Sequence, residues 1–417
     1  MNVCKKIVFG LIVGLIIGGC DYPYEPELQG PPPGTVVDLS ARIVPINPGT
    51  QTCNPSITQN QQYFPGCMAW LNLQGPFDVR FPDPNNTNYP KTFRDNYPDK
   101  ASIPHERITI SDSTNTVVWY LRKPDFVNGS EVQDPEWCTH PDYIAFLGSD
   151  FSLKWDGMVV RISDKSVLKF NEDMLKDYST PHIWLPDPAT IPAPDFSATA
   201  TLSNTTFSAN DDSSGMVDKT TINQYFGTDT VKITFCKGTA SGISIFYIDY
   251  SEAAPQLRQL ERPAGKGPQW ICESPLISPD GNWVAYNCKI GNGAETNEAY
   301  IQELAEGSKP IRIASVGAEP HWWKDPVDSA LYIVYTDRGG PLPSELNDNT
   351  NDGSIGSTFI QAVDFEKLAE ASQNNYGTWI ASLGMLFELG DFPFKGGLSR
   401  DGRFFSTGYQ YTYLYKL

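Results

Sequence analysis

Short runs of β-branched and aromatic residues recur along the chain from residue 36 onward, and clusters of Gly, Pro, Asn and Asp separate them. The clearest runs are VVDLSARIVPI (36–46), RITISD (107–112), TVVWYLR (116–122), VKITF (231–235) and ISIFYIDY (243–250). Short strands bounded by turn residues are typical of all-β proteins. The one convincing helical stretch, FEKLAEAS at 365–372, is too short to set the architecture. We therefore predict an all-β fold.

A sequence unit recurs within this region. In PLISPDGNWVAY, residues 275–286, the pair Ala-Tyr begins ten residues after the proline, and in PEWCTHPDYIAF, residues 135–146, Ala-Phe has the same offset. The segment GGLSRDGRFFST, residues 396–407, repeats the Ser, Asp and Gly of the first unit. Two further units share another signature, PHIW at 181–184 and PHWW at 320–323.

The spacing of these units is close to 45 residues. The intervals 135 to 181 and 275 to 320 are 46 and 45 residues, and the 94 residues from 181 to 275 leave room for one unit centred on VKITFCKG (231–238). The interval from 320 to 396 is 76 residues, so we expect an insertion at about 337–376, where Asn, Asp, Gly and Ser are frequent. Repeats of this length indicate four-stranded propeller blades, and the sequence predicts six of them.

The turn inside each unit has a physical role. Pro and Asp-Gly favour a tight turn in which Gly adopts a φ angle that other residues resist. The run WVAY (283–286) that follows reads as an inner strand buried on both faces. We therefore interpret the repeated residues as structural: Pro275, Ser278, Pro279, Asp280, Gly281, Ser399, Asp401 and Gly402.

At these residues the chain resembles the TolB-like propeller repeat, whose consensus is P-x-W-S-P-D-G-x-x-I-A-F. The resemblance is specific at 275–286 and looser elsewhere, and no unit carries the whole consensus; Arg400, for example, replaces the turn proline. Residues 396–409, together with IVYT at 333–336, also resemble a paralogous group of uncharacterised propeller lipoproteins from fibre-degrading bacteria. These resemblances imply a TolB-like propeller located in the cell envelope, with a link to polysaccharide use or to an envelope complex.

A propeller closes its ring when a strand from the N-terminal side completes the last blade. Only GYQYTYLYKL follows residue 407, so the last blade is incomplete by itself. We expect the hairpin at 107–123 to supply the closing strand. Residues 107–417 then form the propeller, and residues 36–106 form a β-rich N-terminal extension, either a separate cap or an added blade.

The N-terminus has the order of an export signal, with Lys5 and Lys6 ahead of an apolar run at 7–17. Eleven apolar residues are too few for a spanning helix, which needs about 20. The sequence IGGC at 17–20 resembles the lipobox of bacterial lipoproteins, which implies cleavage before Cys20 and lipid on its sulfur. We expect a signal peptide at 1–19, a Pro-rich tether at 20–35 and a lipid anchor in a membrane of the cell envelope. An ordinary secretory signal with an incidental cysteine is the alternative.

The formal charge of the chain is −18, and removal of the two signal lysines makes it about −20. Proteins bind polyanions through Lys and Arg that neutralise phosphates, and this chain has no basic run. The sequence therefore predicts no nucleic-acid partner. The expected partners are the membrane, through the lipid, and a protein or polysaccharide of the envelope.

Six cysteines remain once Cys4 and Cys20 are set aside, and an even number in an exported chain favours disulfides. We expect Cys53 to pair with Cys67, because a short polar loop separates them, and Cys272 with Cys288, because they lie near the two ends of a predicted hairpin. Cys138 and Cys236 are the remaining candidates. A zinc site is the competing interpretation, but the sequence contains no C-x-x-C pair.

Familiar catalytic motifs are missing from the sequence, including G-x-S-x-G, H-E-x-x-H and a phosphate loop. We expect no cofactor and no metal. The run NDNTNDG (347–353) suggests calcium only weakly, because Phe359 stands where a calcium loop has its bidentate Glu. The acidic pair at 211–212 lies on a polar loop and lacks the facing geometry of glycosidase carboxylates.

His182 and His321 occupy the same place in the P-H-x-W signature. Together with Trp322 they are candidate binding residues, since two histidines facing a central channel could act as ligands or bases. Equivalent positions in repeats more often keep equivalent packing roles, which is the structural alternative.

We therefore predict a lipid-anchored, six-bladed propeller that binds a protein or glycan of the cell envelope without catalysing a reaction. One alternative is a propeller-type polysaccharide hydrolase or lyase, which would need carboxylates or histidines that converge on the ring axis. The other is a scaffold subunit of an envelope complex.

Overall fold

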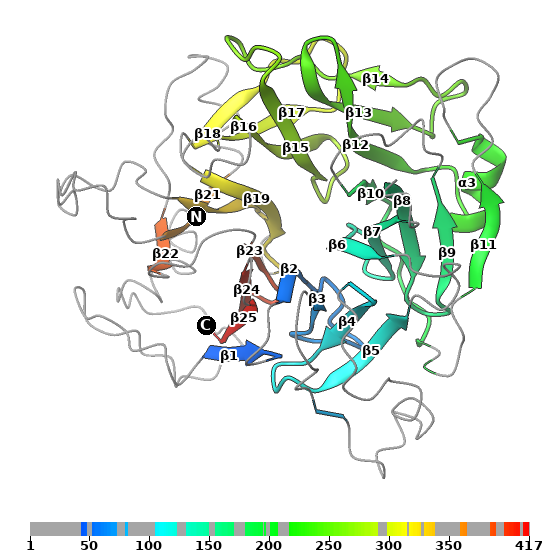
Figure 1. Ribbon diagram of the computed structural model, residues 1–417, viewed down its shortest axis with the longest axis vertical. Coiled ribbons are helices and arrows are strands. Elements are labelled where there is room, and N and C mark those ends of the chain that lie inside the picture. Colours follow the sequence, from blue (N-terminus) through cyan, green and yellow to red (C-terminus); the bar gives the residue numbers. More distant parts are fainter. Residues whose placement is uncertain are drawn as a thin grey trace.

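The computed structural model describes seventeen parts of the chain. They are residues 43–47, 52–72, 80–81, 105–122, 131–149, 155–170, 180–194, 196, 201–206, 217–290, 298–314, 317–326, 329–337, 359–364, 384–388, 396–408 and 412–416. Sheets follow one another around a central axis, which gives the ring seen in Figure 1. Five sheets are present in the described residues, and the eight-stranded one consists of two blades joined by the single parallel pair Ile243 and Ile271, so the ring has six blades.

The first three blades follow the chain from residue 52. Blade 1 holds β2 (Thr52–Ile57), β3 (Met68–Asn72), β4 (Arg107–Ser111) and β5 (Val117–Arg122). Blade 2 holds β6 (Val132–Trp137), β7 (Tyr143–Ser149), β8 (Trp155–Arg161) and β9 (Ser166–Lys169), with β11 (Thr201–Thr206) added parallel to β9. Blade 3 holds β10 (His182–Trp184), β12 (Lys232–Thr239), β13 (Gly242–Asp249) and β14 (Arg258–Gln259).

The other three blades complete the ring. Blade 4 holds β15 (Trp270–Ile277), β16 (Trp283–Ile290), β17 (Glu298–Glu303) and β18 (Ile311–Ala314). Blade 5 holds β19 (Gly317–Lys324), β20 (Leu331–Asp337), β21 (Phe359–Asp364) and β22 (Gly384–Glu388). Blade 6 holds β23 (Gly396–Leu398), β24 (Phe404–Gly408), β25 (Thr412–Lys416) and, at its outer edge, β1 (Ile43–Ile46).

The strand that closes the ring is β1. It pairs antiparallel with β25, so that Ile43 lies opposite Tyr415 and Ile46 opposite Thr412. Our prediction that the hairpin at 107–123 donates this strand is wrong, because β4 and β5 already complete blade 1 together with β2 and β3. The predicted boundary at 106/107 therefore cuts through a blade, and residues 52–72 belong to the ring instead of to an extension.

The unit predicted around residue 231 is also not a blade of its own. Strand β12 pairs with β10, so the PHIW signature and VKITFCKG belong to one blade with a long connection between its first two strands. That connection contains the helix α3 (Lys219–Phe226), which the sequence analysis missed. Asp218 caps its N-terminus by accepting from Thr221 N, and Gly227 ends it in the left-handed conformation at φ 72°.

The predicted insertion at 337–376 is only partly correct, because β21 lies inside it and pairs with β20 as a regular strand of blade 5. The expected helix at 365–372 lies outside the described residues.

The innermost strands of blades 1, 2 and 4 share a bulge beside a proline. Asn54, Asp134 and Ser274 have φ angles of 47°, 49° and 52°, and each precedes a proline in β2, β6 and β15 respectively. Each strand shifts its register at this point. An innermost strand has a free edge toward the axis, where a proline costs no ladder hydrogen bond. This geometry explains the recurrent proline.

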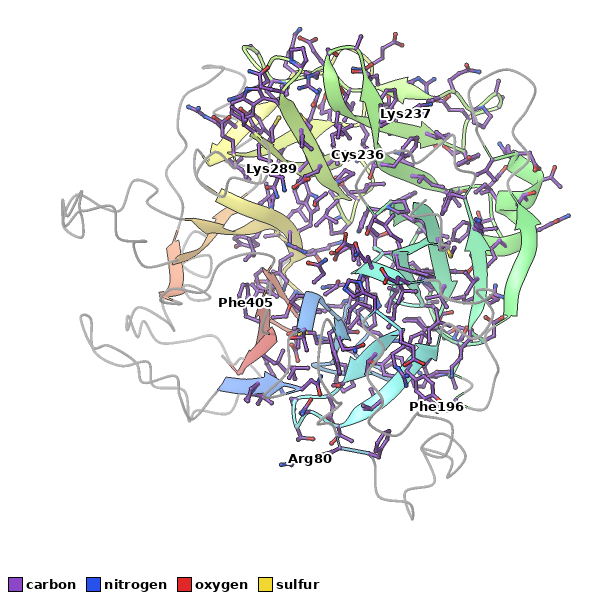
Figure 2. All side chains as sticks on the ribbon, in the orientation of Figure 1. Arg80, Phe196, Cys236, Lys237, Lys289 and Phe405 are labelled. Atoms are coloured by element: carbon purple, nitrogen blue, oxygen red, sulfur yellow. The ribbon has the colours of Figure 1, made fainter. Side chains whose placement is uncertain are left out.

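The core lies between neighbouring sheets, as Figure 2 shows. Trp119 and Phe146 fill the space between blades 1 and 2, and Ile183 and Phe235 belong to the cluster between blades 2 and 3. The run WVAY forms the start of β16, the second strand of blade 4, and its Val, Ala and Tyr are buried as expected. Burial between sheets, repeated around the ring, is what stabilises a propeller.

Candidate functional site at the strap face

A proline-rich segment crosses one end of the ring. Residues 185–194, which we name the strap, leave β10 of blade 3 and make polar contacts with three other blades. The hydroxyl of Tyr63 in blade 1 donates to the carbonyl of Ile191 at 3.3 Å, and Thr139 in blade 2 accepts from Leu185 N at 3.2 Å. Arg400 in blade 6 lies 3.2 Å from the carboxylate of Asp187. The strap therefore spans the mouth of the ring at the end where the innermost strands finish.

A hollow of about 420 Å³ lies between the strap and blade 2. The strap side is lined by Pro188, Thr190, Pro192 and Ala193. The blade side is lined by six residues in or directly beside the β6–β7 and β8–β9 turns, namely His140, Asp142, Tyr143, Arg161, Ser163 and Asp164. Pockets of this size, with apolar walls and a few convergent polar groups, are typical of ligand sites.

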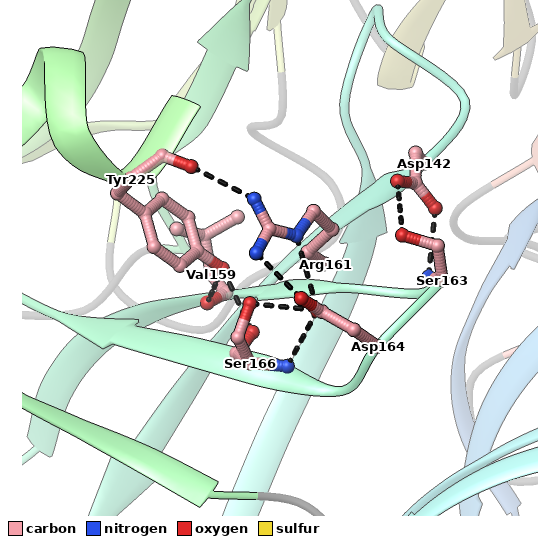
Figure 3. Close-up of polar contacts among 7 residues, drawn as sticks. All are labelled: Asp142, Val159, Arg161, Ser163, Asp164, Ser166 and Tyr225. Carbon is pink, nitrogen blue, oxygen red and sulfur yellow. Dashed lines mark hydrogen bonds and ion pairs between the residues drawn. The ribbon is translucent and has the colours of Figure 1, made fainter. Parts of the chain in front are cut away.

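Asp142 connects the two turns of blade 2. It is 4% exposed, and its carboxylate accepts from Ser163 N at 2.8 Å and from Ser163 Oγ at 2.7 Å (Figure 3). Burial raises the pKa of Asp142 to about 6, against the hydrogen bonds from Ser163, which favour the ionised form. Each oxygen has two lone pairs and receives one of these hydrogen bonds, so the carboxylate keeps accepting capacity.

His140 is held by the same turn. Its Nδ1 accepts from Asp142 N at 3.1 Å, which assigns the hydrogen of the neutral ring to Nε2. Burial lowers the pKa of His140 to about 4, and the charge of Asp187 only partly offsets this. At neutral pH the pocket is therefore lined by an uncharged imidazole that can donate from Nε2.

Arg161 and Asp164 form an ion pair at the pocket edge (Figure 3). Arg161 donates from Nε to Oδ1 at 3.0 Å and from Nη2 to Oδ2 at 2.5 Å, and its Nη1 donates to the carbonyl of Tyr225 at 3.0 Å. Asp164 also accepts from the backbone and hydroxyl of Ser166. Burial opposes ionisation of Asp164, but the hydrogen bonds from Arg161 and Ser166 outweigh it and lower its pKa. The cation of this pocket is therefore already paired.

A second polar group lies at the ring axis. Ser56 Oγ donates to Glu136 Oε1 at 2.7 Å and accepts from Trp137 N at 2.9 Å. His321 Nε2 lies 3.6 Å from the same Glu136 oxygen. The three side chains come from β2, β6 and β19, the innermost strands of blades 1, 2 and 5. A carboxylate and a histidine thus converge on the axis, where they are largely buried.

His182 does not share this environment with His321. It is 4% exposed; its Nδ1 accepts from Ile277 N at 2.9 Å, and its Nε2 lies 3.2 Å from the carbonyl of Trp137. His182 therefore connects blades 2, 3 and 4 through backbone groups. Trp322 is also buried, and its indole donates to the carbonyl of Leu276 at 2.7 Å.

The Ser-x-Asp-Gly turns form the contacts between blades. In blade 4 the hydroxyl of Ser278 accepts from Trp283 N at 2.9 Å and donates to Asp280, while Gly281 N donates to the carbonyl of Ser278 at 2.9 Å. Trp184 of blade 3 donates to the carbonyl of Pro279 at 3.0 Å.

Blade 6 repeats this arrangement. Ser399 donates to Asp401 at 2.5 Å, and the indole of Trp323, from blade 5, donates to the carbonyl of Ser399 at 3.0 Å. Asp325 lies five residues after Pro320, as Asp280 does after Pro275. In the structure it takes the place of Ser278 instead, because Asp325 N donates to the carbonyl of Ala330 as Ser278 N donates to that of Trp283.

The predicted Cys53–Cys67 disulfide is incompatible with the structure. Cys53 lies opposite Leu71, four residues beyond Cys67 on the partner strand, and Cys67 is a free thiol. Four residues of strand span about 13 Å, whereas bridged cysteines need Cα atoms within about 7 Å. Cys138 and Cys236 are buried and lie in different core clusters.

Cys272 and Cys288 are opposite each other in the β15–β16 register. Directly opposite residues in antiparallel strands have Cα atoms about 4.5–5.5 Å apart, which suits a disulfide. The structure holds both as thiols, and a hydrogen bond to Cys272, followed by burial, raises the pKa of Cys288. Their pairing stays a prediction.

Several expected features lie outside the described residues: Cys20 with the signal and tether, the run at 347–353 and the acidic pair at 211–212. Within the described ranges, no three His, Cys, Asp or Glu side chains gather as metal ligands. The helix found there is not long and apolar enough to cross a membrane.

Sequence reasoning missed the strap pocket and the axial Glu136. One signal for the pocket was visible, since the Pro-Asp pair of the 135–146 unit falls two residues later than in the 275–286 unit. That displacement puts Asp142 where it reaches Ser163.

No protein-family model matches the chain, and no curated protein matches it. Among solved structures, the putative TolB from Agrobacterium tumefaciens is 9% identical with a TM-score of 0.42, over 88% of this chain and 91% of that chain. TolB from Acinetobacter baumannii is 13% identical with a TM-score of 0.39, over 85% and 64%. The tricorn protease is 9% identical with a TM-score of 0.38, over 90% and 34%. The propeller fold itself follows from the order of the sheets.

Proposed function

We propose that this chain is a lipid-anchored propeller of the cell envelope that binds a glycan or protein ligand without transforming it. The observation that carries the binding role is the pocket of about 420 Å³ between the strap and blade 2, where apolar walls meet donor and acceptor groups. The N-terminal order of an export signal, two lysines followed by an apolar run, and the lipobox resemblance at 17–20 support the envelope location.

Binding is tested with the full-length protein in a detergent that has no sugar head group. A glycan array and a pull-down from envelope extract are run in parallel, without and with calcium. Saturable binding of one glycan class or of one envelope protein supports the proposal. Recovery of one envelope protein, with no signal on the array, would assign a scaffold role. Silence in both experiments contradicts a binding function.

Lipid attachment is tested separately by growth with radiolabelled palmitate. The Cys20→Ala variant loses the label and accumulates as the unprocessed precursor, because the sulfur that receives the lipid is missing. Cys4→Ala, within the same leader, is the matched control and keeps the label. Equal labelling of the two variants contradicts the anchor.

The convergence of Glu136 and His321 on the axis favours polysaccharide cleavage as a second candidate function. A carboxylate and a histidine can exchange protons with a substrate in a lyase reaction, although glycosidases typically use two carboxylates. Glu136→Gln would then abolish the release of new chain ends from a bound polysaccharide. Binding without release, in the unmodified protein, supports the non-catalytic function.

A further inference from the structure

Among the described residues that line the strap pocket, the cation is Arg161, and it is already in an ion pair with Asp164. Arg161 donates two N–H groups to the carboxylate of Asp164 in bidentate geometry. It donates a third N–H group to the carbonyl of Tyr225. An anionic ligand would have to compete with the carboxylate of Asp164, which is covalently fixed beside the guanidinium. His140 is uncharged at neutral pH and adds no positive charge.

The groups that remain suit hydroxyls. Asp142 accepts one hydrogen bond at each oxygen from Ser163, which leaves lone pairs to accept from a ligand. His140 Nε2–H donates, and the hydroxyl of Thr190 on the opposite wall donates or accepts. A sugar hydroxyl both donates and accepts, so neighbouring hydroxyls can pair with Asp142 and His140 at once.

The walls suit the C–H faces of a sugar ring. Pro188, Pro192 and Ala193 of the strap present apolar groups to the pocket, and the ring of Tyr143 packs edge-on to His140 with centroids 5.0 Å apart. Pro188, Pro192 and Ala193 are exposed to solvent, so a ligand that covers them buries apolar area.

Charge disfavours acidic sugars. Asp142 is a carboxylate inside the pocket above its titration range, and the whole chain carries −18. A uronate or phosphate placed there would meet a like charge in a partly desolvated site, which is costly.

We propose that the pocket between the strap and blade 2 binds an uncharged sugar residue of a polysaccharide, with Asp142 and His140 pairing its hydroxyls and the strap prolines covering its ring. This inference rests on the proposed binding function and names the ligand class and the site.

The test uses calorimetric titration of the full-length protein with cellohexaose, xylohexaose, mannohexaose and arabinohexaose, and with hexagalacturonate as the acidic counterpart. We expect at least one neutral oligosaccharide to bind, and hexagalacturonate to bind at least tenfold more weakly or not at all. Hexagalacturonate bound as tightly as the neutral sugars overturns the inference.

Variants locate the site. Ala193→Trp fills the pocket from an exposed strap position that anchors no core, and Asp142→Asn removes the charged acceptor. Each weakens neutral-sugar binding at least tenfold, whereas Asp401→Asn, the same exchange in the blade 6 turn, changes it less than twofold. Near-UV circular dichroism confirms that each variant is folded.

The outcomes separate the two proposals. Sugar binding that Ala193→Trp leaves unchanged places the site elsewhere and overturns this inference while the binding function stands. Recovery of an envelope protein without any sugar binding likewise overturns this inference and leaves the binding function standing. Absence of every ligand overturns both.

Discussion

The indole of Trp184 lies against the Cα of Gly281 in the next blade. A Cβ added to Gly281 would stand 2.6, 2.8 and 2.9 Å from three ring carbons, and the glycine has a φ of 75°. A side chain at position 281 is therefore disfavoured for two reasons: the backbone has a positive φ angle, and the indole of Trp184 from the neighbouring blade fills the space.

We predict that Gly281→Ala destabilises the protein by about 2–5 kcal/mol, the sum of a left-handed backbone cost of about 1–2 and an overpacking cost of about 1–3 kcal/mol. Chemical unfolding followed by tryptophan fluorescence measures this. Gly307→Ala is the matched control, since Gly307 has a φ of 74° but no atom within 4 Å of the added Cβ. It should cost only about 1–2 kcal/mol. Equal costs would show that the Trp184 contact contributes nothing.

A second prediction concerns pH. At pH 5 the folded protein holds His140 neutral and Asp142 protonated, because their pKa values are about 4 and about 6. In the unfolded chain the reference values are 6.5 and 3.8, so histidine carries the proton instead. Both states bind one proton through this pair, and the two contributions to the pH dependence of unfolding cancel between about pH 4 and 6.

Single substitutions remove that cancellation. In Asp142→Asn the unfolded state binds more protons, so the free energy of unfolding rises with pH by up to about 1.4 kcal/mol per unit between pH 4 and 6.5. In His140→Gln the folded state binds more, so the slope has the opposite sign between pH 4 and 6. Urea titrations at half-unit pH steps measure the slopes. Parallel curves for the two variants would contradict the assigned protonation states.

A third prediction concerns Cys272 and Cys288. In protein secreted under oxidising conditions we expect these register partners to form a disulfide, which closes a loop of about 15 residues and contributes about 3 kcal/mol. Peptide mass spectrometry after alkylation without reductant detects the bridge.

Cys67, Cys138 and Cys236 are buried and should react with alkylating agents only after unfolding. Full alkylation of Cys272 in the oxidised protein would show that the pair stays reduced.

The closing strand provides a fourth prediction. Ile46 of β1 is 2% exposed and packs with Trp70 and Leu414. Ile46→Ala should cost about 2–5 kcal/mol, as for other buried aliphatic truncations. Ile290→Ala, the same exchange at a side chain that is 38% exposed, should stay within about 0.5 kcal/mol. Thermal and urea unfolding compare the pair, and similar losses would mean that β1 is not needed for a closed ring.

The sequence predicted the blades best where a local rule applied. Pro135 and Pro275 mark the bulge of an innermost strand, and Ser278, Asp280 and Gly281 form a turn closed by contacts within five residues. Such patterns depend on neighbours in the chain, so they are visible in one sequence.

Assigning blades from the spacing of the sequence units failed where a blade depends on contacts between residues far apart in the chain. Strand β10 has only three residues and is followed by the strap, so the 94-residue interval contained one interrupted blade instead of two. The sixth blade came from residues 52–122, which the count had not reached. Likewise, no local feature of residues 43–46 indicates that they pair with residues 412–416.

The candidate site was unpredictable for a similar reason. Asp142 acquires its raised pKa from burial beside Ser163, twenty-one residues away, and the pocket exists only because the strap returns over blade 2. An Asp or a Ser at these positions gives no sign of the pocket in the sequence alone.

The position of β1 has a mechanical consequence. It is the outermost strand of blade 6 and the first described element after the proposed membrane attachment, so tension on the anchor acts on the four residue pairs that join β1 to β25. Under load the ring would yield there first. The innermost strands, which carry Glu136 and lead to the strap pocket, would keep their partners while the rim absorbs the force.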